Sequence, residues 1–310
     1  MLPCSATAVN TRNWEIVRAM VFVITRSDHD NLIGTSLIHQ LALAWFQTPL
    51  PSKLTLKTAL IILTTALALS SGAYARDSDT LRLGIDPSYP PMDAKAPDGS
   101  FKGFDVDLGN EICRRIHARC EWVELEFSGM IPALQARKID AVMSSMAITE
   151  KREQQILFSS KLFQFKSRLV ARQGSGLGNT PATLAGKQIG VQSGTQFETW
   201  TLSHWAPNGV HIVAYKSQDE VFSDLVNGRL DGALLGSVEA DIGFLRTPAG
   251  KGFAFVGAPL EMGDRGVGIG LRKDETALKA SMDTAIAAML KDGTYAQIAH
   301  KYFDFNPYGD

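Results

Sequence analysis

The chain has 310 residues, of which 45% are hydrophobic and 20% are charged, and its net charge at pH 7 is −1. This is the composition of an ordinary globular protein, and the length favours two domains. A nearly neutral chain with no dense Lys/Arg run argues against nucleic acid or an anionic membrane surface as the main partner. The three cysteines and six scattered histidines form no CxxC motif and no Cys/His cluster, so we expect neither a metal nor another cofactor.

Residues 53–75, KLTLKTALIILTTALALSSGAYA, have the three parts of a secretory signal peptide. Lys53 and Lys57 give a positive start, and the apolar run 59–69 is too short to span a membrane. The stretch ends with AYA at Ala75, which matches the small-x-small cleavage rule. We therefore expect export to the periplasm and cleavage after Ala75. A buried helix or a short anchor is the alternative.

Residues 1–52 precede this signal and show no convincing domain pattern. A signal peptide normally stands at the very N-terminus, so we interpret residues 1–52 as an extension of doubtful biological status. Our hypothesis is that translation begins near Lys53. No cysteine stands at the cleavage point, so a lipid anchor is not expected.

From residue 80 onward the pattern alternates between short apolar strands and amphipathic helices, in two sets separated by a Gly/Ser/Asn-rich loop at 174–180. The expected strands are 81–85, 122–125, 139–143, 167–171, 188–191, 212–215, 232–235 and 266–271. The expected helices are 103–115, 130–137, 195–203, 217–227, 238–244, 276–290 and 294–302. The prolines within 86–91 argue against strand or helix there. Such repeated units predict an α/β fold of two lobes with predominantly parallel sheets.

Polar residues gather where the expected strands end, which is where α/β folds bind ligands. The stretch Asp140–Arg152 reads DAVMSSMAITEKR: an apolar strand stops at Ser144 and Ser145, and a polar helix follows Thr149. Two hydroxyl groups beside an arginine can hold a small anion such as a carboxylate. A strand-to-helix junction with a capping threonine and a solvated arginine is the alternative.

Cys113 and Cys120 are the two cysteines of the expected mature chain. On one continuous helix their spacing is a rise of about 10.5 Å, which is too long for a disulfide. The helix must end near 117–119 for them to meet. Export favours bonding them, with two free buried thiols as the alternative.

From about residue 81 to 309 the chain resembles the periplasmic binding proteins that serve ABC importers of polar amino acids, in particular those for histidine and for lysine, arginine and ornithine. The stretches that carry the resemblance are GIDPSYPP, GFDVDLGNEICRRI, IPALQARKIDAVMSSMAITEKR, SDLVNGRLDGAL, GVGIGLRKD and DGTYAQIAHKYFDFNPYG. The resemblance implies the type 2 periplasmic binding protein fold, with two lobes joined by two hinge strands. It also implies chain crossings just before Ser167 and near 264–268. The expected lobes are 76–166 with 265–310, and 167–264.

The resemblance implies roles for three residues around the side chain of the ligand. Asp86 faces its cationic end, Tyr89 packs along its aliphatic stem, and Phe127 covers that stem. These roles agree with the chemistry, because a carboxylate selects charge and aromatic rings add burial and a cation–π interaction.

The resemblance also implies a grip on the α-carboxylate of the ligand. Ser144, Ser145 and Arg152 contribute it from the first lobe. Gly194 and Thr195 contribute from the second lobe, at the N-terminus of a helix.

Gly236 departs from the family pattern, which places there an aspartate that holds the α-ammonium group. Losing such a carboxylate should cost on the order of 2–5 kcal/mol for a free amino acid, unless another group replaces it. Glu239 or Asp241 would reach the site only if the helix turned.

Three further positions depart from the pattern. Ala147 replaces a serine contact, and Gln196 and Phe197 stand where relatives carry Thr and Gln. Small residues at 147 and 236 would enlarge the site, as an N-carboxyalkyl group requires. The ligand is thus expected to be a basic amino acid or an N-substituted derivative, such as an octopine- or nopaline-like opine.

The expected function is a non-catalytic binding protein that delivers this ligand to an inner-membrane ABC permease, and we expect a monomer. An enzyme on the same fold, resembling cyclohexadienyl dehydratases, is one alternative; it needs a general acid, whereas Asp86 already has a binding role. A sensor input domain is another. It would need a membrane helix and a signalling domain after residue 310, or a retained anchor.

Overall fold

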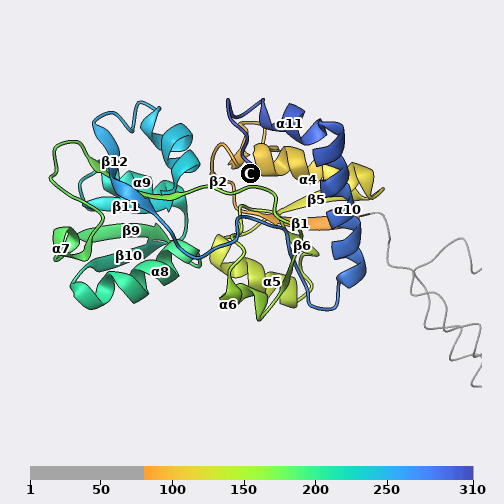
Figure 1. Ribbon diagram of the computed structural model, residues 1–310, viewed down its shortest axis with the longest axis horizontal. Coiled ribbons are helices and arrows are strands. Elements are labelled where there is room, and N and C mark those ends of the chain that lie inside the picture. The colour runs from red at the N-terminus through yellow and green to blue at the C-terminus, as the bar shows by residue number, and fades with distance from the viewer. Residues whose placement is uncertain (1–79, 310) are drawn as a thin grey trace, which may run out of the picture. The chain divides into compact units, whose positions relative to one another are not determined.

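The computed structural model describes residues 80–309, which form two five-stranded sheets and one small three-stranded sheet (Figure 1). The strand orders are β5-β1-β6-β13-β7, β10-β9-β11-β8-β12 and β2-β3-β4. The expected signal peptide at 53–75 and the segment 1–52 lie outside the described residues.

The first large sheet has parallel pairs of β1 with β5 and with β6, and β13 returns antiparallel to β6 and β7. Its strands are β1 (Thr80–Ile85), β5 (Arg119–Glu124), β6 (Ala141–Val142), β7 (Leu157–Phe158) and β13 (Gly270–Leu271). The helices of this lobe are α4 (Phe104–Arg115), η1 (Phe127–Gly129), α5 (Met130–Gln135), α6 (Glu150–Glu153), α10 (Thr276–Asp292) and α11 (Thr294–Ala299). We call this part the first lobe.

The second large sheet pairs β9 in parallel with β10 and β11, while β8 runs antiparallel to both β11 and β12. Its strands are β8 (Ser167–Arg172), β9 (Gln188–Gln192), β10 (His211–Tyr215), β11 (Gly232–Gly236) and β12 (Phe253–Leu260). Its helical segments are α7 (Pro181–Leu184), α8 (Gln196–His204), η2 (Ala206–Asn208), α9 (Gln218–Val226) and the π-helix η3 (Glu239–Leu245). We call this part the second lobe.

Each lobe has its own apolar core, which confirms the predicted two-lobed α/β fold. Phe104 and Leu83 belong to the core of the first lobe, and Trp205 and Phe244 to that of the second. β11 is buried at every position, as expected for a central strand covered on both faces. The predicted residue limits of the lobes, 76–166 with 265–310 and 167–264, stay a prediction.

Three expectations about the strands are wrong. Both large sheets are mixed rather than predominantly parallel, because β8, β12 and β13 add antiparallel pairs. The strand β12 was not expected at all. The proline-rich stretch does contain a strand, since β2 (Ser88–Tyr89) pairs with β3 (Asp93–Lys95), which in turn pairs with β4 (Phe101–Lys102). Tyr89 directly precedes Pro90, so the ladder ends before the residues that lack an N–H group.

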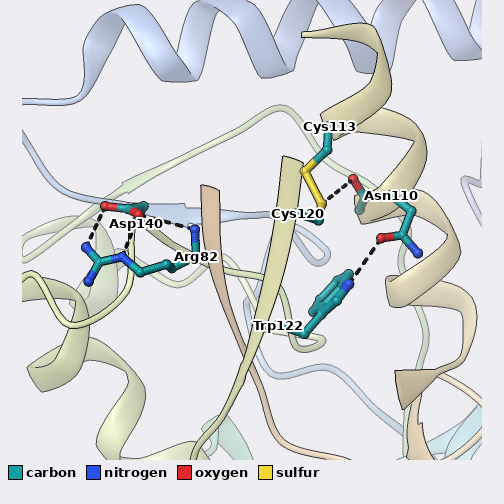
Figure 2. Close-up of a disulfide and its surroundings, with 7 residues drawn as sticks. Arg82, Asn110, Cys113, Cys120, Trp122 and Asp140 are labelled. Carbon is teal, nitrogen blue, oxygen red and sulfur yellow. Dashed lines mark hydrogen bonds and ion pairs between the residues drawn. A yellow bond between two sulfur atoms is a disulfide. The ribbon is translucent and has the colours of Figure 1, made fainter. Parts of the chain in front are cut away.

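A disulfide joins Cys113 of α4 to Cys120 of β5, as predicted (Figure 2). The helix ends before His117, which has a positive φ of 56°, and the chain turns back so that the two Cα atoms lie 5.9 Å apart. The Trp122 indole N–H donates to the Asn110 side-chain oxygen at 3.1 Å and forms a second link between the same two elements.

Within residues 80–309, no helix combines the length and the hydrophobicity needed to cross a membrane.

Candidate ligand-binding site

A cavity lies where strands of both large sheets end. Its lining from the first lobe is Asp86, Tyr89, Phe127, Ser144 and Ser145, and its lining from the second lobe is Gln192, Thr195, Gln196 and Phe197. Seven of the site residues predicted from the sequence thus come together. The other four, Ala147, Arg152, Gly194 and Gly236, lie beside the cavity without lining it.

Asp86 follows β1 and is 6% exposed. Its Oδ1 accepts hydrogen bonds from the Ser88 backbone N–H at 3.1 Å and the Ser88 hydroxyl at 2.8 Å. Its Oδ2 accepts from the Phe127 N–H at 3.2 Å and from Gln192 Nε2 at 2.6 Å. Burial raises the pKa of Asp86, and the hydrogen bonds with Ser88, Gln192 and Phe127 oppose that rise. Two donors on each oxygen hold the carboxylate in one orientation.

Gln192 is the lining residue that the sequence interpretation missed. It is the last residue of β9, is 3% exposed, and its Nε2 also donates to the Lys216 carbonyl at 3.2 Å. A polar residue at the carboxyl end of an apolar strand is the signal that could have identified it. Its bond to Asp86 links the two lobes.

The two serines lie at the end of β6 but direct their hydroxyl hydrogens away from the pocket. The Ser144 hydroxyl accepts from the Asp86 N–H at 3.0 Å and donates to Asp93 Oδ2 at 3.1 Å. The Ser145 N–H and hydroxyl donate to Asp105 Oδ2 at 2.5 and 3.0 Å. In this arrangement the hydroxyl oxygens offer the pocket lone pairs rather than hydrogens.

Asp93 and Asp105, on β3 and α4, form a fully buried acidic pair behind these serines. Each keeps one oxygen, Oδ1, without a hydrogen-bonding partner among the described residues. Burial raises the pKa of Asp93 well above its usual range, with Asp105 adding repulsion, and burial raises the pKa of Asp105 to about 6. Burial and the repulsion from Asp105 therefore favour the protonated form of Asp93. The sequence did not reveal this pair, because it depends on tertiary burial.

Arg152 lies in α6, which Thr149 caps. Its guanidinium donates to the Ala147 carbonyl at 2.8 Å and to the Gly194 carbonyl at 2.9 Å, so it crosses between the lobes. It lies 5.4 Å from the centre of the Phe127 ring. Burial lowers the pKa of Arg152 to about 10, so it remains charged at pH 7. With 7% exposure, Arg152 is not the solvated side chain of the alternative interpretation.

Gly194 and Thr195 form the turn from β9 into α8. Gly194 has a φ of 78°, and a Cβ there would lie 2.7 Å from the Cα of Ser128, so only glycine fits this approach between the lobes. The Thr195 hydroxyl accepts from the Glu198 N–H at 3.3 Å and donates to the Gln192 carbonyl at 2.6 Å. The N-terminus of α8 begins at Gln196 and therefore faces the cavity, where it favours negative charge.

The room that Gly236 was expected to add is already filled. A Cβ built on Gly236 would overlap the Oε2 atom of Glu239 and would lie 3.1 Å from the Tyr89 hydroxyl. The Gly236 N–H donates to that hydroxyl at 3.2 Å. Ala147 is 1% exposed and bridges to Val267, so its small side chain is packed against protein.

Comparison with known proteins agrees with this fold. Residues 81–305 match the family model of bacterial extracellular solute-binding proteins, family 3. The chain is 46% identical over 261 residues to the lysine/arginine/ornithine-binding periplasmic protein of Escherichia coli K12, covering 82% of this chain and 100% of that protein. It is 44% identical to the histidine-binding periplasmic protein of Salmonella typhimurium, covering 83% and 99%, and 43% identical to the L-arginine-binding protein of Pseudomonas aeruginosa, covering 82% and 98%.

Among solved structures, an ancestral arginine-binding protein bound to arginine superimposes with a TM-score of 0.69 at 32% identity. That match covers 74% of this chain and 100% of the ancestral protein. The chain belongs to the bacterial extracellular solute-binding proteins of family 3.

Proposed function

We propose that this protein is the periplasmic substrate-binding component of an ABC importer for a basic amino acid. The observation that carries the proposal is the fixed, buried carboxylate of Asp86 in a cavity walled by Tyr89 and Phe127. A carboxylate held by neighbouring donors selects a cationic side chain, and the rings cover its aliphatic part. The names of the relatives, which bind lysine, arginine, ornithine or histidine, support the same ligand class.

Arg152 would bind the α-carboxylate of the ligand. Two of its donor groups hold the Ala147 and Gly194 carbonyls, and a guanidinium carries five N–H donors, so others remain for a ligand. The N-terminus of α8 beside Thr195 would add a favourable electrostatic contribution. The roles of these site residues are part of the proposal.

Ligand capture would couple to closure of the lobes. Hydrogen bonds join the first lobe to the second. Three of them connect Arg152 with Gly194, Gln192 with Asp86, and Tyr89 with Gly236. A ligand that contacts both lobes binds the closed state more tightly than the open state and shifts the population toward it. The closed state would then be the form that an inner-membrane permease recognises. A monomer, and export by a signal peptide cleaved after Ala75, are further parts of this proposal.

An N-substituted ligand such as an opine is the second candidate, because the sequence carries small residues at positions 147 and 236. The filled space beside Gly236 weighs against it, because an added carboxyalkyl group has less room there. We therefore favour a free basic amino acid.

Calorimetric titration of the exported protein with arginine, lysine, ornithine, histidine, octopine and nopaline tests the proposal. We expect micromolar or tighter binding of at least one free basic amino acid. Binding of opines alone would favour the second candidate. Turnover of prephenate or arogenate, with no binding of any of the six compounds, would replace the proposed function by an enzymatic one.

A further inference from the structure

Glu239 is a buried acid three residues after β11, and the site residues named above do not include it. It is 3% exposed, and its Oε2 has no hydrogen-bonding partner among the described residues. It is the first residue of the π-helix η3. Single π-helical turns often occur at functional sites, because they redirect a side chain that a regular helix would place elsewhere.

The packing of η3 fixes this carboxyl against the first lobe. A Cβ on Gly243, in the same segment, would overlap the Pro90 carbonyl, so η3 and the loop that carries Tyr89 are in close contact. The Glu239 carboxyl fills the place of a side chain at Gly236 and interacts with the Tyr89 hydroxyl. Because Tyr89 lines the cavity, Glu239 lies directly behind the cavity wall.

The charges around Glu239 make it a receptor for a cation. The charge of Asp105 acts on it, and that carboxylate accepts hydrogen bonds from Ser145 of the cavity lining. Burial, with repulsion from Asp105, raises the pKa of Glu239 to about 8. A buried carboxyl oxygen without a hydrogen-bonding partner is costly for a folded protein, and a ligand that brings a positive nitrogen beside that oxygen removes the cost.

We propose that Glu239 is a specificity-determining residue that receives the primary ammonium group of the ligand beside the Tyr89 hydroxyl. The inference rests on the proposed function and narrows its substrate class to amino acids with a free α-ammonium group. Asp86 would bind the cationic side chain and Arg152 the carboxylate, which leaves Glu239 for the third charged group. Gly236 is then required, since any side chain there would displace the Glu239 carboxyl.

The variant Glu239→Gln tests this with two ligands, L-arginine and Nα-acetyl-L-arginine, in which an amide replaces the ammonium group. We expect at least a tenfold loss of affinity for arginine and less than a threefold change for the acetylated compound. Asp241→Asn, on the same π-helix, is the matched control: it makes the same carboxyl-to-amide change at a partly exposed residue that pairs with Arg246, and we expect less than a twofold change for either ligand. Equal changes for both ligands in Glu239→Gln, or none, would overturn the inference.

A reciprocal exchange separates ligand recognition from folding. Gly236→Asp alone should weaken arginine binding, because its side chain collides with Glu239. The double variant Gly236→Asp/Glu239→Ala should bind arginine at least tenfold more tightly than Gly236→Asp alone, because the carboxylate then comes from residue 236. Failure of the double variant to exceed Gly236→Asp would count against the inference. If the wild-type protein binds no basic amino acid, the proposed function falls together with the inference. If it binds arginine and Glu239→Gln makes no difference, only the inference falls.

Discussion

The Nε2 atom of Gln192 lies 2.6 Å from the Oδ2 atom of Asp86, so an amide of the second lobe occupies one of the four donor positions on the carboxylate proposed to select the ligand. The other three donors come from the first lobe. A cationic side chain that approaches Asp86 must therefore share this carboxylate with Gln192 or displace it.

Replacing Gln192 by leucine removes the competing donor at nearly constant volume. We expect affinity for lysine and arginine to increase about fivefold, which corresponds to about 1 kcal/mol for one hydrogen bond. Calorimetric titration measures the change. Gln192→Ala is the companion variant, because it removes the same donor without adding a charge, and unchanged or weakened affinity in both variants would contradict this account of the site.

Asp86→Asn should discriminate between ligands that differ only in charge. L-arginine and L-citrulline have nearly the same shape, but citrulline carries a neutral urea group. A hydrogen bond to a charged group contributes about 1.5–3 kcal/mol, so we expect arginine to lose about 10- to 100-fold in affinity. Citrulline should change less than threefold. Competition titration with both ligands provides the comparison, and equal losses would show that Asp86 acts on structure rather than on charge.

Arg152→Ala should abolish detectable binding of every amino acid, because it removes the proposed carboxylate partner and also the bonds to the Ala147 and Gly194 carbonyls. Arg152→Lys keeps the charge but lacks the planar fork of donors, and we expect an intermediate loss of about 10- to 100-fold. Thermal unfolding with and without ligand separates loss of binding from loss of folding. Unchanged affinity in Arg152→Ala would remove Arg152 from the site.

Stability should fall as pH rises from about 4.5 to about 8 in the absence of ligand. Burial raises the pKa of Asp93, Asp105 and Glu239 in the folded protein, so the folded state binds more protons than the unfolded state in this range. Where the unfolded state binds fewer protons, the free energy of unfolding decreases with pH. Urea unfolding at half-unit steps of pH measures the slope. Glu239→Gln should reduce the slope above about pH 6, where Asp105 contributes little and Asp93 still contributes. A free energy of unfolding that increases with pH in this range would contradict these pKa assignments.

Much of the site could be predicted, because ligand residues of α/β folds follow the carboxyl ends of strands. Asp86, Ser144 and Thr195 all stand at such ends, and their polarity interrupts an apolar run. The disulfide followed in the same way from the expected export and the need for the helix to end between Cys113 and Cys120.

The parts that escaped prediction depend on contacts between distant segments. Asp93 and Asp105 look like surface acids in the sequence, and only the packing of β3 against α4 buries both. Glu239 required a π-helical turn, which periodicity at the α-helical spacing does not indicate. The strand β12 contains Gly257 and Pro259, and these residues hid it.

Gly194 meets the first lobe through its backbone, with its carbonyl on Arg152 and its Cα facing Ser128. The contact of Gly194 with the first lobe therefore depends on the backbone and on no side chain of the second lobe. Gln196, which lines the cavity, can be exchanged without altering this contact. Evolution or protein engineering can thus change a cavity residue of the second lobe while this backbone contact between the lobes stays intact.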